Sequence, residues 1–282
     1  MPQSIGIVGA GTIGGGIAHL ASLARFTVSL YDVNETVILA ATSRITAEMK
    51  AAADGGKISR EEMTEALSRI HARTKLSELA HCEIVIEAVL EDLKIKRDLF
   101  RRLDGEVKPE TLLATTSSTI PVTSIAAGLK KPERVVGLHF FPPVHRTRLA
   151  EVVRGLQSSE DSTSRGREFV ERLGKTSVTT KDSPGYVVHR VVSLFYGEAL
   201  RVLGEGIATA GDIDRIVKDS GGFSAGPFES MDLEGIDAGM ALAQAIYDQS
   251  FQDPRYRPHP ILKRMAEAGI LGKKSGRGFF IY

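Results

Sequence analysis

The chain contains no tryptophan, a single cysteine and no marked excess of either charge. The one cysteine, Cys82, excludes an internal disulfide and a zinc site built from cysteines, and no metal site is predicted. Cys82 lies in an apolar run, where a buried thiol is more common than a reactive one. The formal net charge is +1, with acidic and basic residues mixed along the chain. This balance argues against nucleic acid or an anionic membrane as a partner.

A long apolar segment is also absent. Residues 5–24 carry few charges, but they contain several glycines and His19, and no basic cluster precedes them. A signal peptide or a membrane span would show the opposite features. We therefore expect a protein of a reducing, aqueous compartment, with the cytoplasm as its location.

The length and composition predict a globular protein of two domains. The chain has 282 residues, of which 42% are hydrophobic and 25% charged, as in ordinary globular proteins. A single hydrophobic core rarely grows to this size. The sequence pattern changes near Ser183, so we predict a first domain over 1–183 and a second over 184–282.

The most informative motif is a glycine-rich turn near the N-terminus, between an apolar run and a helical pattern of small residues. Its sequence is Gly9-Ala10-Gly11-Thr12-Ile13-Gly14. Gly9 permits a tight turn, Gly11 lets the backbone approach a pyrophosphate, and Gly14 allows close packing of helix on strand. The N–H groups of the following helix N-terminus favour phosphate. The motif predicts a dinucleotide site that includes Thr12 and Ile13.

An acidic residue closes the second apolar run. Asp32 lies about twenty residues beyond the glycines, where a carboxylate can accept from both ribose hydroxyls and would repel a 2′-phosphate. Neither Val33 nor Asn34 offers an arginine to accommodate such a phosphate. We therefore predict NAD rather than NADP. On the motif alone FAD stays open, as does a glycine-rich packing site in another α/β domain.

Apolar runs alternate with helical patterns through the first 180 residues. This alternation predicts a doubly wound, mainly parallel sheet of the Rossmann type, covered on both faces. The expected helices after the glycine motif lie within 34–70, with a break near Gly55, and at 92–103, 121–127 and 161–173. The later strands are expected at 82–88, 111–116, 134–138, 149–153 and 177–180.

The second half of the chain is predicted to be all-helical. Pro184 suits the first turn of a long helix that reaches about Leu203, with Asp182 and Ser183 as capping candidates. Further helices are expected over 212–219, 233–249 and 261–268, and a terminal strand over 279–282. This half has more apolar residues than a small helical domain easily buries. A homodimer interface would use them, and packing against the first domain is the alternative.

Two strand ends in the first half carry polar side chains. Thr115 to Thr119 follow one strand, at the sheet edge where ligands bind in doubly wound folds, although such a cluster also caps helices. His139 ends another strand, and Glu151 lies on the next apolar run, where a carboxylate could orient the imidazole. A purely structural histidine is the competing interpretation.

Taken together, the motifs resemble the short-chain L-3-hydroxyacyl-CoA dehydrogenase family, which includes 3-hydroxybutyryl-CoA dehydrogenases. The similarity extends in order over both halves of the chain. The matching segments are 9–14, Glu87-Ala88-Val89-Leu90-Glu91, Thr116-Ser117-Ser118, Gly137-Leu138-His139-Phe140-Phe141, Leu149-Ala150-Glu151-Val152-Val153, Asp182-Ser183-Pro184-Gly185-Tyr186-Val187-Val188, Gly226-Pro227-Phe228-Glu229 and Gly272-Lys273-Lys274-Ser275-Gly276-Arg277-Gly278-Phe279.

The resemblance implies catalytic roles for three residues. His139 matches the general base that takes the proton of the substrate 3-hydroxyl while a hydride passes to NAD. Glu151 matches the acid that supports the imidazolium, and Ser117 matches a serine that contacts the substrate oxygen near the nicotinamide. The substrate is then an acyl-CoA.

The resemblance also implies three charged cofactor contacts. Glu91 and Lys96 match residues near the nicotinamide ribose, and Lys274 matches a lysine that reaches the cofactor. Without the resemblance, a solvated surface charge would be the simpler interpretation of each.

The chain departs from the family pattern at three asparagine positions, which carry Thr115, Pro142 and His189 instead. The last matters most, because the missing amide contacts the substrate in the family and a histidine cannot offer donor and acceptor in the same geometry. His189 is included among the catalytic candidates. Three alternatives stay open: a hydroxy-acid dehydrogenase that does not use CoA, as in the L-gulonate dehydrogenase and lambda-crystallin branch, a non-catalytic NAD-binding protein, and a β-hydroxyacid dehydrogenase with a catalytic lysine.

Overall fold

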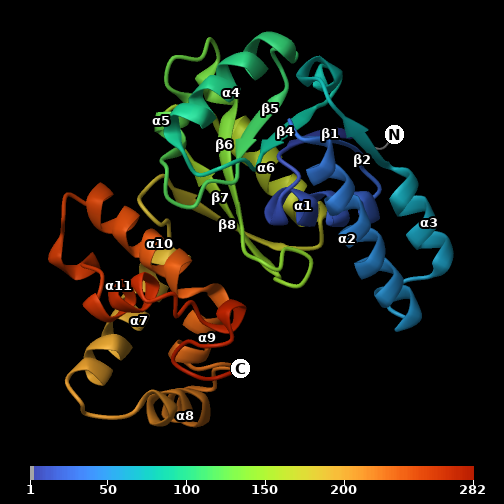
Figure 1. The fold of residues 1–282 in the computed structure, drawn as a ribbon. Helices are drawn as coiled ribbons and strands as arrows, with labels where there is room; N and C mark the ends of the chain where they lie inside the picture. The colour runs from blue at the N-terminus through green and yellow to red at the C-terminus, as the bar shows by residue number, and fades with distance from the viewer. Residues whose placement is uncertain (1–2) are drawn as a thin grey trace. The chain divides into compact units, whose positions relative to one another are not determined.

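The computed structural model describes residues 3–282 (Figure 1). The chain divides into two compact units, one ending at Ser183 and one spanning Pro184–Tyr282. Across the described residues, none of the helices combines the length and the apolar character that a membrane crossing requires.

The first unit is built on one sheet with the strand order β3-β2-β1-β4-β5-β6-β7-β8. Adjacent strands are parallel except at β6 and β7, which run antiparallel. The order 3-2-1-4-5-6 of a doubly wound dinucleotide fold is thus present, with β7 and β8 added at one edge. The strands are β1 Ser4–Val8, β2 Thr27–Tyr31, β3 Ile70–Arg73, β4 Ile84–Glu87, β5 Leu112–Thr115, β6 Val135–Phe140, β7 Leu149–Arg154 and β8 Thr176–Lys181.

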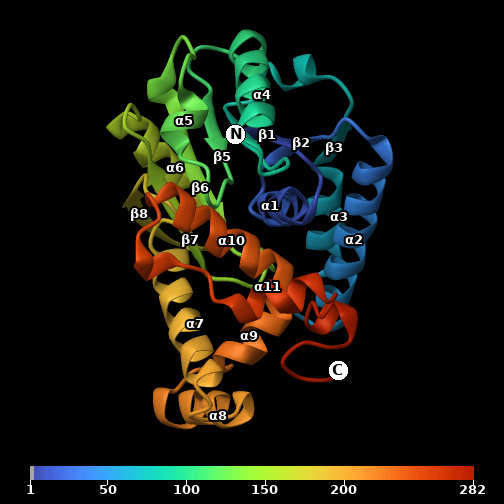
Figure 2. The same ribbon diagram turned by 60° about the vertical axis from the view of Figure 1, so that its left-hand side comes forward.

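Helices cover both faces of this sheet. On β6, the Leu138 side chain faces Gly166 of α6, whereas a Cβ added to Gly137 would meet Val122 of α5. Because neighbouring residues of a strand point to opposite faces, α6 and α5 lie on opposite sides. The views of Figures 1 and 2 agree in placing α2 and α3 beside α1. The helices are α1 Thr12–Leu23, α2 Glu35–Asp54, α3 Arg60–Ser68, α4 Leu93–Glu106, α5 Val122–Ala126 and α6 Glu160–Arg172.

The sequence explains why these elements form. The β4 and β5 strands are buried at every residue, as expected of parallel strands covered on both faces. Asn34 caps α2 by accepting from the Thr36 N–H, and Asp92 caps α4 by accepting from the Ile95 N–H. Cys82 is buried in the core as predicted, and burial raises the pKa of its thiol to about 11. The predicted fold class, an α/β doubly wound sheet followed by helices, is confirmed.

The second unit is helical and has its own core. Leu200, Phe228, Met231 and Ile236 are among the buried residues of that core. The helices are α7 Val188–Gly204, α8 Ala210–Gly221, α9 Pro227–Glu234, α10 Ile236–Gln249 and α11 Pro260–Glu267.

The long helix of the second unit begins later than predicted. Gly185 and Tyr186 have φ values of +71° and +48°, which are left-handed conformations, so a right-handed helix cannot start at Pro184. The predicted cap is also wrong: the Asp182 carboxylate accepts from the N–H of Val122 at 3.0 Å and that of Thr123 at 2.8 Å. Asp182 therefore caps α5 of the first unit.

Two further predictions for the second unit are wrong. The helix expected over 233–249 is broken at Gly235, whose φ of +100° separates α9 from α10. The terminal strand expected over 279–282 is absent, apart from an isolated bridge between Arg277 and Ile281. Instead, the Asp232 carboxylate accepts the N–H groups that a strand partner would have used, at 2.9 and 3.0 Å.

Candidate active site

The glycine motif forms the tight turn between β1 and α1. Gly9 has a φ of +104°, and a Cβ there would lie 2.4 Å from the carbonyl oxygen of Ala88. A Cβ on Gly14 would lie 1.8 Å from the Gly9 oxygen, so helix and strand approach as closely as the motif predicts. Gly11 is the N-cap of α1 and provides no side-chain cap, while Thr12 and Ile13 begin the helix. The first N–H groups of α1 thus suit an anionic group.

Asp32 lies at the end of β2, beside this turn. Its carboxylate accepts from the Ala10 N–H at 2.9 Å and from the Asn34 N–H at 3.0 Å. A cavity of about 320 Å³ lies next to it, bounded by Gly9, Asp32 and apolar side chains that include Leu99. The cavity is mostly apolar, although Asp98 and Arg102 also line it. A glycine turn, a helix N-terminus and a carboxylate beside such a cavity fit the pyrophosphate, ribose and adenine of a dinucleotide.

Lys96 of α4 lies between two carboxylates. Its Nζ is 2.6 Å from Glu87 Oε1 and 3.3 Å from Glu91 Oε2. The Lys96 and Glu87 side chains are 1% and 0% exposed, so the interpretation of Lys96 as a solvated surface charge is wrong. The Thr115 hydroxyl donates to the other oxygen of Glu87 at 2.7 Å. Thr115, which stands at one of the departures from the family pattern, thus completes a buried polar network.

Glu91 organises the loop that follows β5. Its Oε1 accepts from the Ser117 hydroxyl at 2.6 Å and from the Thr119 N–H at 3.0 Å. Burial alone would raise the pKa of the Glu91 carboxyl, but the charge of Lys96 and these hydrogen bonds lower its pKa to about 2. Glu91 is therefore an anion at neutral pH, and Ser117 is held against it.

His139 and Glu151 face each other on antiparallel strands. The register pairs the two residues directly, and Nδ1 of His139 is 2.7 Å from Glu151 Oε2. The two side chains are 3% and 1% exposed, and the Phe141 ring lies edge-on to the imidazole with 4.5 Å between centroids. A buried carboxylate at Nδ1 fixes the orientation of the ring and stabilises its protonated form.

The remaining candidates lie in the second unit. His189 is the second residue of α7, and its side chain is half-buried. Lys274 is partly exposed, and its Nζ pairs with Asp237 at 2.5 Å. The roles of both residues at the cofactor or substrate stay predictions.

Sequence reasoning missed Glu87 as part of the site. It was visible only as the first residue of the Glu87–Glu91 segment, and its position after an apolar run gave it no distinct signal. In the structure it is the buried anion that holds Lys96 and Thr115 together.

Comparison with known proteins assigns both units of the chain to domains of one protein family. The family described as "3-hydroxyacyl-CoA dehydrogenase, NAD binding domain" matches residues 4–183, and its "C-terminal domain" matches residues 185–282. The chain is similar to 3-hydroxybutyryl-CoA dehydrogenase of Mycobacterium tuberculosis, at 39% identity over 99% of this chain and 98% of that protein. A probable 3-hydroxybutyryl-CoA dehydrogenase of Bacillus subtilis is 38% identical over 99% and 97% of the two chains.

A solved structure agrees with these sequence matches. The (S)-3-hydroxybutyryl-CoA dehydrogenase of Ralstonia eutropha superimposes with a TM-score of 0.95 at 34% identity, covering 100% of this chain and 99% of that one. The family matches confirm the predicted enzyme class and the predicted cofactor, NAD. The chain belongs to the 3-hydroxyacyl-CoA dehydrogenase family.

Proposed function

We propose that this chain catalyses the reversible, NAD-dependent oxidation of an L-3-hydroxyacyl-CoA, such as 3-hydroxybutyryl-CoA, to the 3-ketoacyl-CoA. The single observation that carries the proposal is the buried His139–Glu151 pair on β6 and β7. The names of the bacterial relatives, which match over nearly the full chain, support the short acyl group.

The chemistry assigned to the pair follows from its geometry. Oxidation at C3 requires removal of the hydroxyl proton, and an imidazole can accept a proton near neutral pH. Because Glu151 lies at Nδ1, the proton is exchanged through Nε2 of His139. The imidazolium that forms is stabilised by the adjacent carboxylate, and the same ring returns the proton in the reverse direction.

The other residues of the site are proposed to bind and orient the cofactor and the substrate. Bound NAD would be held by the glycine turn and by Asp32, and it supplies the hydride acceptor. Ser117 lies at the carboxyl end of β5, where Glu91 and Lys96 fix the loop, and it is proposed to contact the substrate oxygen. We propose that Glu91 acts at the nicotinamide ribose. Lys96 is a positioning residue that acts through Glu91 and Glu87, because its own side chain is 1% exposed.

His189 is proposed to take the place of the family's asparagine at the substrate, as one hydrogen-bond donor. Lys274 is proposed to reach the cofactor. Both proposals rest on the positions of these residues in the family pattern.

The protein is proposed to act in the cytoplasm. It is also proposed to form a homodimer through the second unit. Val191 and Leu194 are 63% and 38% exposed and lie on one face of α7, being three residues apart. Such apolar exposure is typical of an interface. Light scattering coupled to size exclusion measures the mass in solution, and a monomer at micromolar concentration would contradict the homodimer.

A substrate panel tests the proposed reaction. The purified chain is mixed with NADH and either acetoacetyl-CoA or free 3-keto acids, and loss of NADH absorbance is followed. Rapid oxidation with acetoacetyl-CoA is expected. Oxidation only with free acids would favour the hydroxy-acid branch, and tight NADH binding without turnover would favour a non-catalytic NAD-binding protein.

A further inference from the structure

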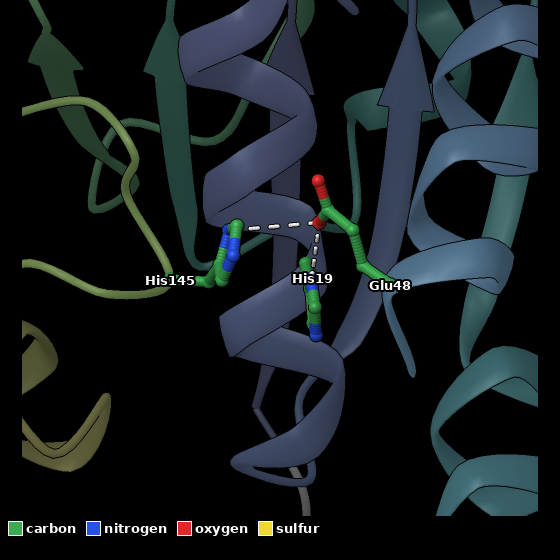
Figure 3. Close-up of side chains that lie close together, drawn as sticks. All are labelled: His19, Glu48 and His145. Carbon is green, nitrogen blue, oxygen red and sulfur yellow. Dashed lines mark hydrogen bonds and ion pairs between the residues drawn. The ribbon is translucent and has the colours of Figure 1, made fainter. Parts of the chain in front are cut away.

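Three potential metal ligands converge beside the nucleotide-binding helix α1, and none of them is a member of the His139–Glu151 pair. His19 lies on α1, Glu48 on α2, and His145 in the segment between β6 and β7. Figure 3 shows the three side chains reaching one place from these separate elements, with both imidazole rings linked to the same carboxylate oxygen of Glu48. Their ligand atoms all lie within 4.8 Å of one another.

The distances suit a small transition-metal ion. Glu48 Oε2 is 3.1 Å from Nδ1 of His19 and 3.5 Å from Nδ1 of His145. In a tetrahedral zinc site with metal–ligand bonds of about 2.0–2.1 Å, neighbouring ligand atoms are separated by about 3.3–3.4 Å. The carboxylate oxygen is thus at the spacing from each histidine that a shared ion requires, and in the structure these two distances are a hydrogen bond and an ion pair. The two rings are stacked with 20° between their planes, so one imidazole must turn about χ2 for both Nδ1 lone pairs to point at one ion.

The scaffold holds the histidine of the loop in place. Val144 packs on Gly16 of α1, where an added Cβ would lie 2.7 Å from the Val144 Cβ. Gly16 and His19 are three residues apart and share a helix face, so this contact brings the loop over His19. The buried Lys175 donates to the Val144 carbonyl at 2.6 Å and also to the Thr147 carbonyl. His145 is therefore anchored on both sides.

Burial of His19 favours the neutral imidazole, which is the form that binds metal. Burial is the main reason that the pKa of His19 is lowered, and the nearby His145 lowers it further, although Glu48 acts in the opposite direction. The rings of His19 and His145 are stacked with centroids 5.3 Å apart. Two imidazolium ions at this separation would repel each other, whereas neutral imidazoles are the form that binds metal.

We propose that His19, Glu48 and His145 form a binding site for a divalent transition-metal ion of the zinc class. Two imidazole nitrogens and one carboxylate oxygen suit zinc, cobalt or nickel, whereas magnesium and calcium prefer oxygen ligands. Three protein ligands leave one position for water. The ion would cross-link α1, α2 and the loop between β6 and β7, so it stabilises the first unit independently of the proposed reaction.

Zinc titration of the chelator-treated protein tests the proposal. One equivalent per chain should bind by calorimetry, magnesium should not bind, and zinc should raise the Tm. His145→Ala should weaken zinc binding by more than about 100-fold, since loss of even an outer-shell partner costs about 10–100-fold. The side chain of His145 is 21% exposed, so this variant should fold. The matched control is His71→Ala, which removes an exposed histidine of β3 and should leave zinc binding unchanged.

A second variant and a second metal ion test the proposed ligands independently of His145→Ala. Glu48→Gln retains the size of the side chain and removes the anionic ligand, so it should also lose the site. Cobalt bound to the wild type should show the visible absorption of a four-coordinate ion, and His145→Ala should abolish that absorption. Absence of stoichiometric zinc binding by the wild type would overturn the proposal. So would unchanged binding in both variants, because the ion would then lie elsewhere, for example at His139.

Discussion

Nδ1 of His139 and Oε2 of Glu151 are 2.7 Å apart because the two residues are direct partners in the antiparallel pairing of β6 with β7. Their geometry depends on the register of two neighbouring strands inside the sheet and not on a loop. A slip of one residue would move either side chain to the opposite face of the sheet. Every strand residue beside them is buried, so packing on both faces of the sheet holds this register in the folded chain.

Asp32 is predicted to determine the preference for NAD over NADP. Asp32→Asn keeps the size of the side chain and removes the charge that would repel a 2′-phosphate. A hydrogen bond to a charged group contributes about 1.5–3 kcal/mol, so NADH should bind at least tenfold more weakly relative to NADPH than in the wild type. The chain has no tryptophan, so titrations that follow NADH fluorescence measure both constants without that background. An unchanged ratio of the two constants would remove Asp32 from the ribose site.

Lys96 is predicted to be essential for stability because it neutralises the buried Glu87. Lys96→Met should lower the free energy of unfolding by about 3–5 kcal/mol, the usual effect of removing one partner of a buried ion pair. Urea denaturation followed by circular dichroism measures the change. The control Arg215→Ala breaks an exposed pair with Asp212 and should cost less than about 1 kcal/mol.

A double variant distinguishes the effect of the unpaired Glu87 charge from the effect of the lost Lys96 side-chain contacts. In Glu87→Gln with Lys96→Met, the fully buried position 87 no longer carries an unpaired charge, and only the partly exposed Glu91 still lacks its cation. Part of the lost stability should therefore return. A double variant that is less stable than Lys96→Met alone would contradict this explanation.

The lowered pKa of Glu91 predicts that the free energy of unfolding decreases in acid. Its pKa in the folded chain is about 2, below the ordinary value of 4.5, so its contribution is complete above pH 4.5 and disappears as the pH falls toward 2. Glu91→Gln should therefore flatten the decline of unfolding free energy within that interval, as measured by urea denaturation at several pH values. Other carboxyls with lowered pKa, such as Asp104, remain in the variant and account for the residual slope. Equal slopes for the two proteins would show that Glu91 does not carry this effect.

His189 is predicted to be a tolerated substitute for the family's asparagine. His189→Asn restores an amide with both a donor and an acceptor, so turnover of acetoacetyl-CoA should be maintained or increased. Steady-state rates over a range of pH measure the effect, with His71→Ala as the control. A loss greater than tenfold would mean that His189 has a role of its own in this chain.

The features that the sequence predicted well are local. The glycine turn, the following helix and Asp32 are read within one short segment, and each has its own steric or electrostatic reason. The sequence spacing of His139 and Glu151 did not establish that the two side chains meet. Whether they face each other depends on the register between two strands, which neither strand specifies alone.

The features that were missed or wrong depend on tertiary structure. Asp182 is a residue type that often caps helices, but the sequence does not show which helix it caps. In the folded chain its carboxylate caps α5. The last residues of the chain have the composition of a strand, yet their N–H groups bond to Asp232. His19, Glu48 and His145 come from three separate elements, so no sequence spacing could have indicated them together.

The most direct test of the central claim is the turnover of acetoacetyl-CoA by His139→Gln and Glu151→Gln beside the wild type, with NADH affinity measured in the same proteins. If His139 is the base, His139→Gln should lower kcat by about 100- to 10,000-fold. Glu151→Gln should also lower kcat, and both should leave the affinity for NADH unchanged. A kcat within a few-fold of the wild type for His139→Gln would contradict the account.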